Sequence, residues 1–197
     1  GGGYVAYRTD SGAIFVGRLG AEDVRQLDPY GTGDPEDDTP EYTAEAISVA
    51  EDGTLYSYSA ADGAVLRFRI PSGEVAGRDT VDTGPDADDV DITAAGEDWV
   101  LVDLADGRAW RRGADEPVTA DLTGSALVSR PMSGDAVYLA DQAGLVRVPI
   151  DGTPTRVVGG ADRDYGTPAR PVAFDGEVYA AWVRADGGVL WRSGSET

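Results

Sequence analysis

The chemistry open to this sequence is mainly that of carboxylates, because several other reactive residue types are missing. Its 197 residues contain no His, Cys, Lys or Asn, and 16 Arg carry all of the basic side-chain charge. Without His and Cys, a Ser-His-Asp or Cys-His mechanism is excluded, and so are disulfides and zinc–thiolate sites. Two carboxyl groups at the right separation would still be sufficient to hydrolyse a glycosidic bond.

Three carboxylates stand in or beside strands that we expect at the centre of the fold: Glu45, Asp89 and Asp91. Two further strands of the same kind, at residues 126–129 and 171–174, carry no charge, so the sequence offers no separate general acid. We therefore assign no catalytic residue and predict that the protein is not an enzyme. A carboxylate-based glycoside hydrolase is the alternative.

The acidic run Asp86–Asp91 (DADDVD) has the oxygen ligands that calcium prefers. Counted from Asp86 as the first position of an EF-hand loop, Glu97 stands at the twelfth. The EF-hand pattern fails nevertheless, because Val90 occupies the fifth position and Asp91 the sixth, where glycine is required. A solvated loop is the favoured interpretation of this run.

Two other acidic segments are also predicted to be loops or turns. Asp162–Gly166 (DRDYG) begins like a ligand loop, but Arg163 would repel a cation. Glu36–Asp38 belongs to an acidic insertion at residues 31–41 whose composition is typical of a soluble loop. We assign no metal ligand and no cofactor, and a calcium-stabilised structural domain remains a further alternative.

Aromatic side chains could form platforms on which sugar rings stack. Of the four Trp, three stand at or next to positions that are core positions in other copies of an internal repeat, so we expect them to be packed: Trp99, Trp110 and Trp191. Trp182 lies in a longer strand segment and is the candidate for an exposed aromatic side chain.

The net charge of −20 limits the partners of this chain. Nucleic acid and anionic membrane surfaces are excluded, because Lys and Arg must neutralise their negative charge. The acidity is explained either by solubility together with the codon preference of a GC-rich genome, or by cation binding or adaptation to high salt. No segment is long and apolar enough to span a bilayer.

The elements that must position these side chains are five copies of one hairpin. Its clearest copy, Thr54–Gly73, has two alternating strands around a turn at Asp62-Gly63. The turn glycines of successive copies are 51, 44, 37 and 43 residues apart, a period typical of propeller blades. These glycines are Gly12, Gly63, Gly107, Gly144 and Gly187.

An arginine follows the turn in every copy, and we expect its stem to cover apolar surface on a half-solvated strand. The five are Arg18, Arg67, Arg111, Arg147 and Arg192.

Further strands flank the hairpins and complete four-stranded blades. In every copy but the first, a short strand of small apolar residues precedes the hairpin, as expected near a crowded central axis. In every copy but the last, a more polar strand follows it at the outer edge. The predicted inner strands are 46–50, 90–94, 126–129 and 171–174, and the predicted outer strands are 24–27, 74–81, 117–122 and 154–158.

The sequence therefore predicts an all-β, β-propeller-like fold of about five four-stranded blades, in a single domain over residues 1–197. The repeats are placed at 1–28, 42–81, 89–122, 125–159 and 168–197. The incomplete first and last copies favour an incomplete or excerpted ring over direct pairing of two three-stranded blades. A β-sandwich is the rival fold, but it would not explain a repeated hairpin with a shared period.

The first copy, with Gly3–Leu19 (GYVAYRTDSGAIFVGRL), and the turns A-D-G-R-A-W and A-D-G-A-V-L-R-F carry a resemblance to a known family. The chain resembles the N-terminal propeller-like region of actinobacterial surface proteins that contain fibronectin type III domains. It departs from that family in lacking a strand before the glycines and a visible fibronectin domain. The resemblance implies an extracellular, membrane-tethered scaffold without assigned catalytic residues, so no functional residue is carried over.

Together these observations predict a non-enzymatic scaffold or recognition module, extracellular or at the cell surface. It would bind a protein or a glycan through loops on one face of the propeller. The binding residues and the oligomeric state are not predicted.

Overall fold

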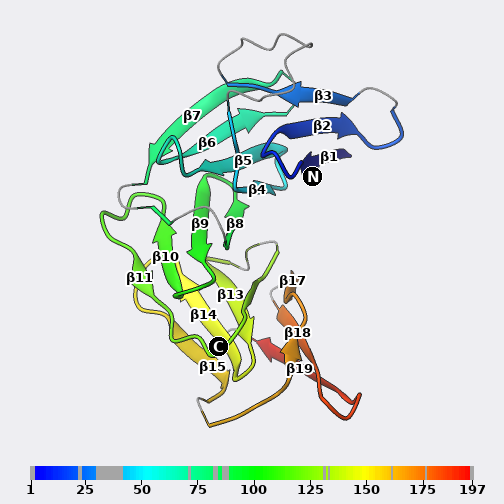
Figure 1. Ribbon diagram of the computed structural model, residues 1–197, viewed down its shortest axis with the longest axis vertical. Coiled ribbons are helices and arrows are strands. Elements are labelled where there is room, and N and C mark those ends of the chain that lie inside the picture. Colours follow the sequence, from blue (N-terminus) through cyan, green and yellow to red (C-terminus); the bar gives the residue numbers. More distant parts are fainter. Residues whose placement is uncertain are drawn as a thin grey trace. The chain divides into compact units, whose positions relative to one another are not determined.

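The computed structural model describes residues 3–21, 24–29, 42–70, 72–81, 84–85, 89–130, 132, 134–160, 162–175 and 177–195, the last six by their backbone alone. The acidic insertion at 31–41, with Glu36–Asp38, and Asp86–Asp88 of the acidic run lie outside these residues. Every secondary-structure element assigned in the described part is a β-strand (Figure 1). The described residues contain no helix that could cross a membrane.

The 19 strands follow one another along the chain. They are β1 (Tyr4–Arg8), β2 (Ile14–Arg18), β3 (Val24–Leu27), β4 (Ala46–Val49), β5 (Thr54–Ser59), β6 (Ala64–Arg69), β7 (Glu74–Thr80), β8 (Val90–Ala95), β9 (Asp98–Asp103), β10 (Arg108–Arg111), β11 (Val118–Thr119), β12 (Leu127–Val128), β13 (Ala136–Asp141), β14 (Gly144–Pro149), β15 (Thr155–Gly159), β16 (Thr167–Pro168), β17 (Val172–Phe174), β18 (Glu177–Val183) and β19 (Val189–Ser195).

Within the described residues these strands form five antiparallel sheets, one for each predicted repeat. The first sheet has three strands in the order β1-β2-β3, and the second runs β4-β5-β6-β7. A third sheet contains β9 and β10, and the fourth runs β12-β13-β14-β15. In the last sheet β19 pairs with the whole of β18, while the short strands β16 and β17 pair with its other edge. The predicted order of inner, middle and outer strands is confirmed in the second and fourth sheets.

The turn glycines that define the repeat have a backbone conformation in common. All five have positive φ, a region in which side chains other than that of glycine are strained. The values are 85° at Gly12, 54° at Gly63, 74° at Gly107, 138° at Gly144 and 81° at Gly187. This shared conformation agrees with a turn at each of these glycines, and the alignment of the five copies stays a prediction.

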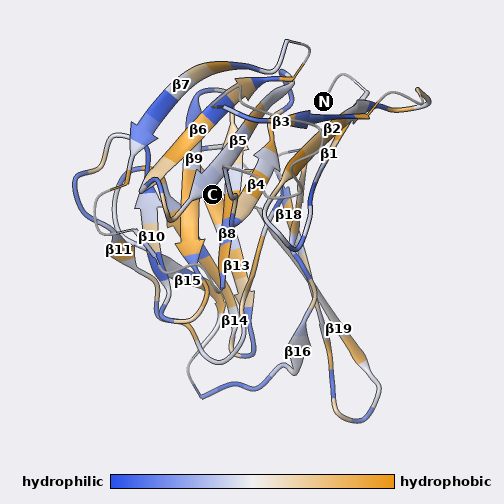
Figure 2. Cartoon of the chain, turned by 45° about the horizontal axis from the view of Figure 1, so that its top comes forward, coloured by the Kyte–Doolittle hydropathy of each residue, from blue (hydrophilic) through white to orange (hydrophobic). Residues whose placement is uncertain are grey.

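Burial changes from the middle strands of a sheet to its outer strand. All six residues of β13 are buried, and so are five of the six residues of β5. In the outer strand β7, by contrast, no residue is fully buried, and in β15 exposed residues alternate with half-buried ones. Figure 2 shows the same contrast, with hydrophobic residues along β9 and β13 and hydrophilic ones in β3 and at the end of β7. In the second and fourth sheets the middle strands β5 and β13 are thus buried on both faces, whereas burial alternates along β2 and β18.

The chain divides into two compact units, Gly1–Glu97 and Asp98–Thr197. In the first unit the core lies between the first and second sheets: Ile14, Val16 and Leu27 pack with Leu55, Leu66, Phe68 and Ile70. In the second unit a core joins the fourth and last sheets: Tyr138 and Leu145 pack with Val178, Ala180 and Trp182. The assignment of residues 1–197 to one domain stays a prediction.

Candidate functional site

The carboxylates that could have served a hydrolase are bound to nearby backbone or exposed. Asp91 in β8 has 6% of its surface exposed, and its Oδ1 accepts a hydrogen bond from the N–H of Ile92 at 2.9 Å. Oε2 of Glu45 accepts one from the N–H of Ala60 at 2.7 Å, which ties the start of β4 to the β5–β6 turn. Asp89 is exposed. No group of three or more acidic side chains in the described part of the chain could hold a metal ion.

The segment Asp162–Gly166 is a loop, as predicted. Oδ1 of Asp164 accepts a hydrogen bond from the N–H of Gly166 at 2.9 Å, which closes a local turn. The N–H of Tyr165 donates to the carbonyl of Gln142 at 2.7 Å and so attaches this loop to the β13–β14 turn.

The tryptophans with described side chains belong to the core. Trp99 and Trp110 are 2% and 5% exposed, which confirms their predicted packing. The hypothesis that Trp182 is exposed is wrong, because its side chain is completely buried. Its Nε1 donates to the carbonyl of Asp141 at 2.6 Å, and Tyr165 packs edge-on against its ring. The side chain of Trp191 lies outside the described residues.

A buried carboxylate that the sequence did not single out is Asp141, at the end of β13. It is fully buried and accepts hydrogen bonds from the N–H groups of Thr123 and Ala143 at 2.8 and 2.9 Å. The guanidinium of Arg156 donates to both carboxylate oxygens, at 2.9 and 2.8 Å. The side-chain hydrogen bond to Asp141 raises the pKa of Arg156 above its ordinary value despite partial burial. With its oxygens occupied in this way, Asp141 is a structural residue.

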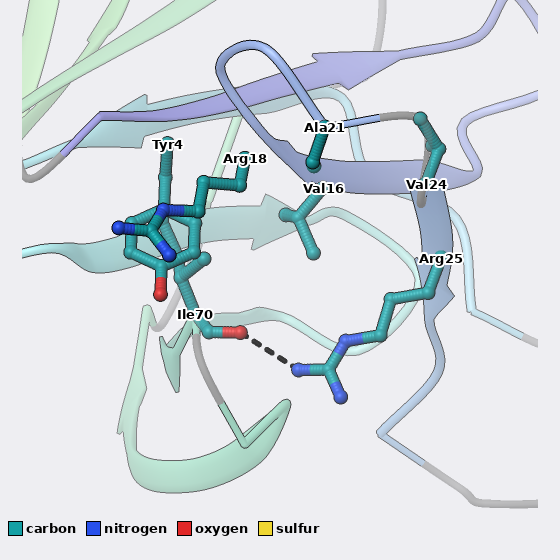
Figure 3. Close-up of a pocket in the computed structure, with 8 residues that line it drawn as sticks. Tyr4, Val16, Arg18, Ala21, Val24, Arg25 and Ile70 are labelled. Atoms are coloured by element: carbon teal, nitrogen blue, oxygen red, sulfur yellow. Dashed lines mark hydrogen bonds between the residues drawn. The ribbon is translucent and has the colours of Figure 1, made fainter.

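The candidate binding site is a pocket of about 420 Å³ at one end of the first sheet. Arg18 at the end of β2 and Arg25 in β3 supply its positive charge, and Figure 3 shows them on opposite sides of Val16. Its exposed apolar side chain is that of Val24, whereas Val16 and Ile70, which directly follows β6, are almost completely buried. The lining residues are Tyr4, Val16, Gly17, Arg18, Ala21, Val24, Arg25 and Ile70.

Arg25 is held in place by the β6–β7 turn. Its Nη2 donates a hydrogen bond to the carbonyl of Ile70 at 2.7 Å (Figure 3). The guanidinium also lies against Gly73, where a Cβ atom would be only 2.9 Å from Nη2 and 3.2 Å from Cζ. Gly73 has a φ of 70°, so glycine suits both the backbone and the close approach of Arg25.

Arg18 differs from the arginines with described side chains at the same position of the other repeats. Arg67 lies 3.7 Å from Asp79, and Nη2 of Arg147 bonds Asp135 at 2.5 Å. Arg111 donates to the carbonyls of Pro149 and Gly152 at 3.1 and 2.8 Å. Arg18 is exposed, and no described carboxylate forms an ion pair with it or with Arg25.

The sequence signal for this pocket was therefore incomplete. The recurrence of Arg18 was visible, but the expectation that the stem of each such arginine covers apolar surface said nothing of the partners of the Arg67, Arg111 and Arg147 guanidinium groups. The sequence did not indicate a role for Arg25, because its hydrogen-bond partner, the carbonyl of Ile70, lies 45 residues away in the chain.

Comparison with solved structures identifies the fold class. The virginiamycin B lyase from Staphylococcus aureus has 13% sequence identity and a TM-score of 0.52, and the match covers 97% of this chain and 69% of that one. BamB from Moraxella catarrhalis has 15% identity and a TM-score of 0.55, with 98% and 58% covered. The β-propeller domain of Cps50 (Swd1) from Myceliophteria thermophila has 12% identity and a TM-score of 0.62, with 99% and 68% covered.

This chain has an all-β, β-propeller fold, as its repeats predicted. At these identities the similarity concerns the fold alone, and the chain spans between 58% and 69% of the length of these three proteins. No protein-family model and no curated protein matches the sequence.

Proposed function

We propose that this chain is a non-enzymatic recognition module that binds a protein partner through the pocket around Arg18 and Arg25. The observation that carries the proposal is that two arginines, Arg18 and Arg25, line one pocket in a molecule with a net charge of −20. Arg25 is fixed by backbone contacts, so little side-chain freedom is lost when a partner binds to it.

The composition and the contacts of the carboxylates support a role without catalysis. The virginiamycin B lyase variant of Staphylococcus aureus in which one histidine is replaced by alanine is catalytically inactive, and this chain contains no histidine at all. Glu45 and Asp91 bond to backbone N–H groups, which fixes them as parts of the local structure.

A protein partner is favoured over a glycan by the two guanidinium groups of the pocket. Trp99, Trp110 and Trp182 are in the core and offer no platform for a sugar ring, and the exposed aromatic residues Tyr7 and Phe174 do not line the pocket. The pocket combines guanidinium groups with the side chains of Tyr4 and Val24, which suits charged and apolar amino-acid side chains.

The proposed setting is outside the cell or at its surface. Its support is the resemblance of Gly3–Leu19 and of the hairpin turns to the propeller-like region of fibronectin type III-containing surface proteins. Fractionation of the source cells with an antibody against this chain tests the setting, and recovery in the cytoplasmic fraction alone would contradict it.

A selection from a random peptide library displayed on phage tests the recognition function. We expect the immobilised folded chain to enrich linear peptides that bind saturably and that the same chain unfolded in urea does not retain. Failure to enrich any such peptide contradicts the proposal. Turnover of a panel of glycans at an ordinary enzymatic rate, abolished by Asp91→Asn, would establish the hydrolase alternative instead.

A further inference from the structure

The geometry of the pocket points to the chemistry of the partner: we propose that it binds a short acidic segment of a protein, with carboxylates on Arg18 and Arg25. This inference rests on the proposed recognition function and specifies its ligand. The exposed aliphatic side chain of Val24 would contact an apolar side chain of the same segment. A guanidinium and a carboxylate form paired hydrogen bonds that are stronger than those between neutral groups.

Arg25 presents a preorganised donor. One of its nitrogens is already bonded to the carbonyl of Ile70, and its close contact with Gly73 restricts the rest of the side chain. Although fixed, the residue is exposed to solvent, so the remaining N–H groups face a ligand without first having to be ordered. A carboxylate bound to Arg25 would not have to compete with a carboxylate of the protein, because none of the described residues forms an ion pair with Arg25.

Arg18 supplies a second charge, and among the described residues it differs in its contacts from the arginines of three other repeats. At the equivalent positions, Arg67, Arg111 and Arg147 are each held by acidic or carbonyl oxygens of the protein. Arg18 has none of these contacts in the described part of the chain. Among the described residues, no carboxylate forms an ion pair with Arg18 or Arg25, although the chain has 36 acidic and only 16 basic residues.

The overall charge favours a short acidic segment over an extended polyanion. A long nucleic acid would bring many phosphates close to a surface of net charge −20, where repulsion outweighs two local contacts. A short peptide places its carboxylates at the pocket and little further charge elsewhere. Attraction over this distance is screened by salt, so binding must weaken as ionic strength rises.

Binding of a capped hexapeptide composed of Glu and Leu tests this inference, with a twin in which every Glu is replaced by Gln. We expect isothermal titration calorimetry to show at least about tenfold tighter binding of the acidic peptide, the fold-change that corresponds to about 1.4 kcal/mol. We also expect Arg18→Gln and Arg25→Gln each to weaken the acidic peptide by about tenfold, with the Gln peptide unaffected.

Arg184→Gln is the matched control, because Arg184 is an exposed arginine outside the pocket, 4.0 Å from Asp186. It should leave binding unchanged. Thermal unfolding of each variant separates a binding defect from a folding defect. Arg25→Gln loses its bond to Ile70, whereas Arg18→Gln removes no described internal hydrogen bond and should unfold at the wild-type temperature.

The outcomes distinguish this inference from the function on which it rests. If the phage selection yields saturable binders that are not acidic, or that are insensitive to Arg18→Gln, recognition stands and the acidic-segment inference is wrong. If inorganic phosphate competes as strongly as the acidic peptide, the pocket is a general anion site and the inference is also wrong. If no peptide of any composition is retained, both proposals fail.

Discussion

At the scale of single residues, the most consequential charge is that of Asp141. Its carboxylate is buried and bonded to two backbone N–H groups and to Arg156. We predict that Asp141→Ala lowers the free energy of unfolding by about 3–5 kcal/mol, because it leaves the guanidinium and two amides without their partner. Urea unfolding followed by circular dichroism measures this difference.

Asp135→Ala is the control for that substitution, because the Asp135 side chain is exposed and its ion pair with Arg147 lies at the surface. It should change stability by less than about 1 kcal/mol. Because the pKa of Arg156 is raised above its ordinary value, its contribution is fully present below the ordinary arginine pKa and is lost only as pH rises through the raised one. The effect of Asp141→Ala should therefore stay constant from neutral pH into the alkaline range below the ordinary arginine pKa. A loss no larger than that of Asp135→Ala would show that the buried contacts of Asp141 contribute little.

A second prediction concerns the carboxyl of Asp106, in the turn between β9 and β10. Burial acts to raise its pKa, but hydrogen bonds from the backbone N–H and the side chain of Arg108 outweigh it and lower the pKa below 3.8. We expect Arg108→Gln to move the pKa of Asp106 back towards 3.8, as measured by titration of the carboxyl carbon in NMR spectra. The stabilisation is present above 3.8 and is lost as pH falls through the lowered pKa. An unchanged pKa in the variant would contradict the assigned role of Arg108.

The sequence could predict the features that depend on residue type or on position in the repeat. The absence of His and Cys follows directly from composition, and burial of Trp99 and Trp110 followed from their place in the repeat. Burial of Trp182 did not, because its strand is longer than those of other copies and its bonding partner, the carbonyl of Asp141, lies 41 residues away. The contacts of Asp141 with Arg156 and of Arg25 with Ile70 could not be predicted for the same reason. A repeat pattern indicates elements, whereas contacts between elements depend on their packing.

At the scale of elements, the turn glycines of the repeat allow a comparison at equivalent positions. Gly144 has a φ of 138°, and a Cβ atom there would collide with the carbonyl of Val158 in β15. Gly187 has a φ of 81°, but a Cβ atom there would meet no other atom within 4 Å. We predict that Gly187→Ala costs about 1–2 kcal/mol of backbone strain, and that Gly144→Ala costs more, because β15 must also move away from β14.

Equilibrium unfolding of both variants measures these costs, and hydrogen exchange of the β14 and β15 amides locates them. We expect faster exchange in β15 of Gly144→Ala and no change there in Gly187→Ala. Equal costs for the two variants would mean that positive φ alone, and not the contact with Val158, accounts for glycine at Gly144.

Element order was predictable from the hairpin period, while the bounds of short strands were less so. The outer strand expected at 24–27 is β3 without any change, and the strand expected at 46–50 is β4 less one residue. The strands expected at 117–122 and 126–129 shrink to the two-residue strands β11 and β12. Pro117 has no N–H to donate, which helps to explain why β11 begins after it. β16 was not predicted, because only its pairing with β18 makes Thr167–Pro168 a strand.

At the scale of the whole molecule, the net charge leads to a prediction about thermal stability that does not depend on any single contact. With 36 acidic and 16 basic residues, like-charge repulsion opposes the folded state at neutral pH. The screening length falls from about 30 Å at 0.01 M salt to about 3 Å at 1 M, so added sodium chloride should weaken this repulsion. We predict that Tm rises with salt, by about 2–4 °C for each 1 kcal/mol gained.

The same salt series should move acidic-peptide binding in the opposite direction, because that interaction joins opposite charges at Arg18 and Arg25. Differential scanning calorimetry gives Tm and titration calorimetry gives the affinity in one set of buffers, with calcium chloride compared at equal ionic strength. A further rise of Tm in calcium would favour the calcium-stabilised alternative over screening. A Tm that falls with sodium chloride would show that surface ion pairs such as Arg108–Asp103, 3.5 Å apart, outweigh the general repulsion, and the long-range account of this acidic chain would be wrong.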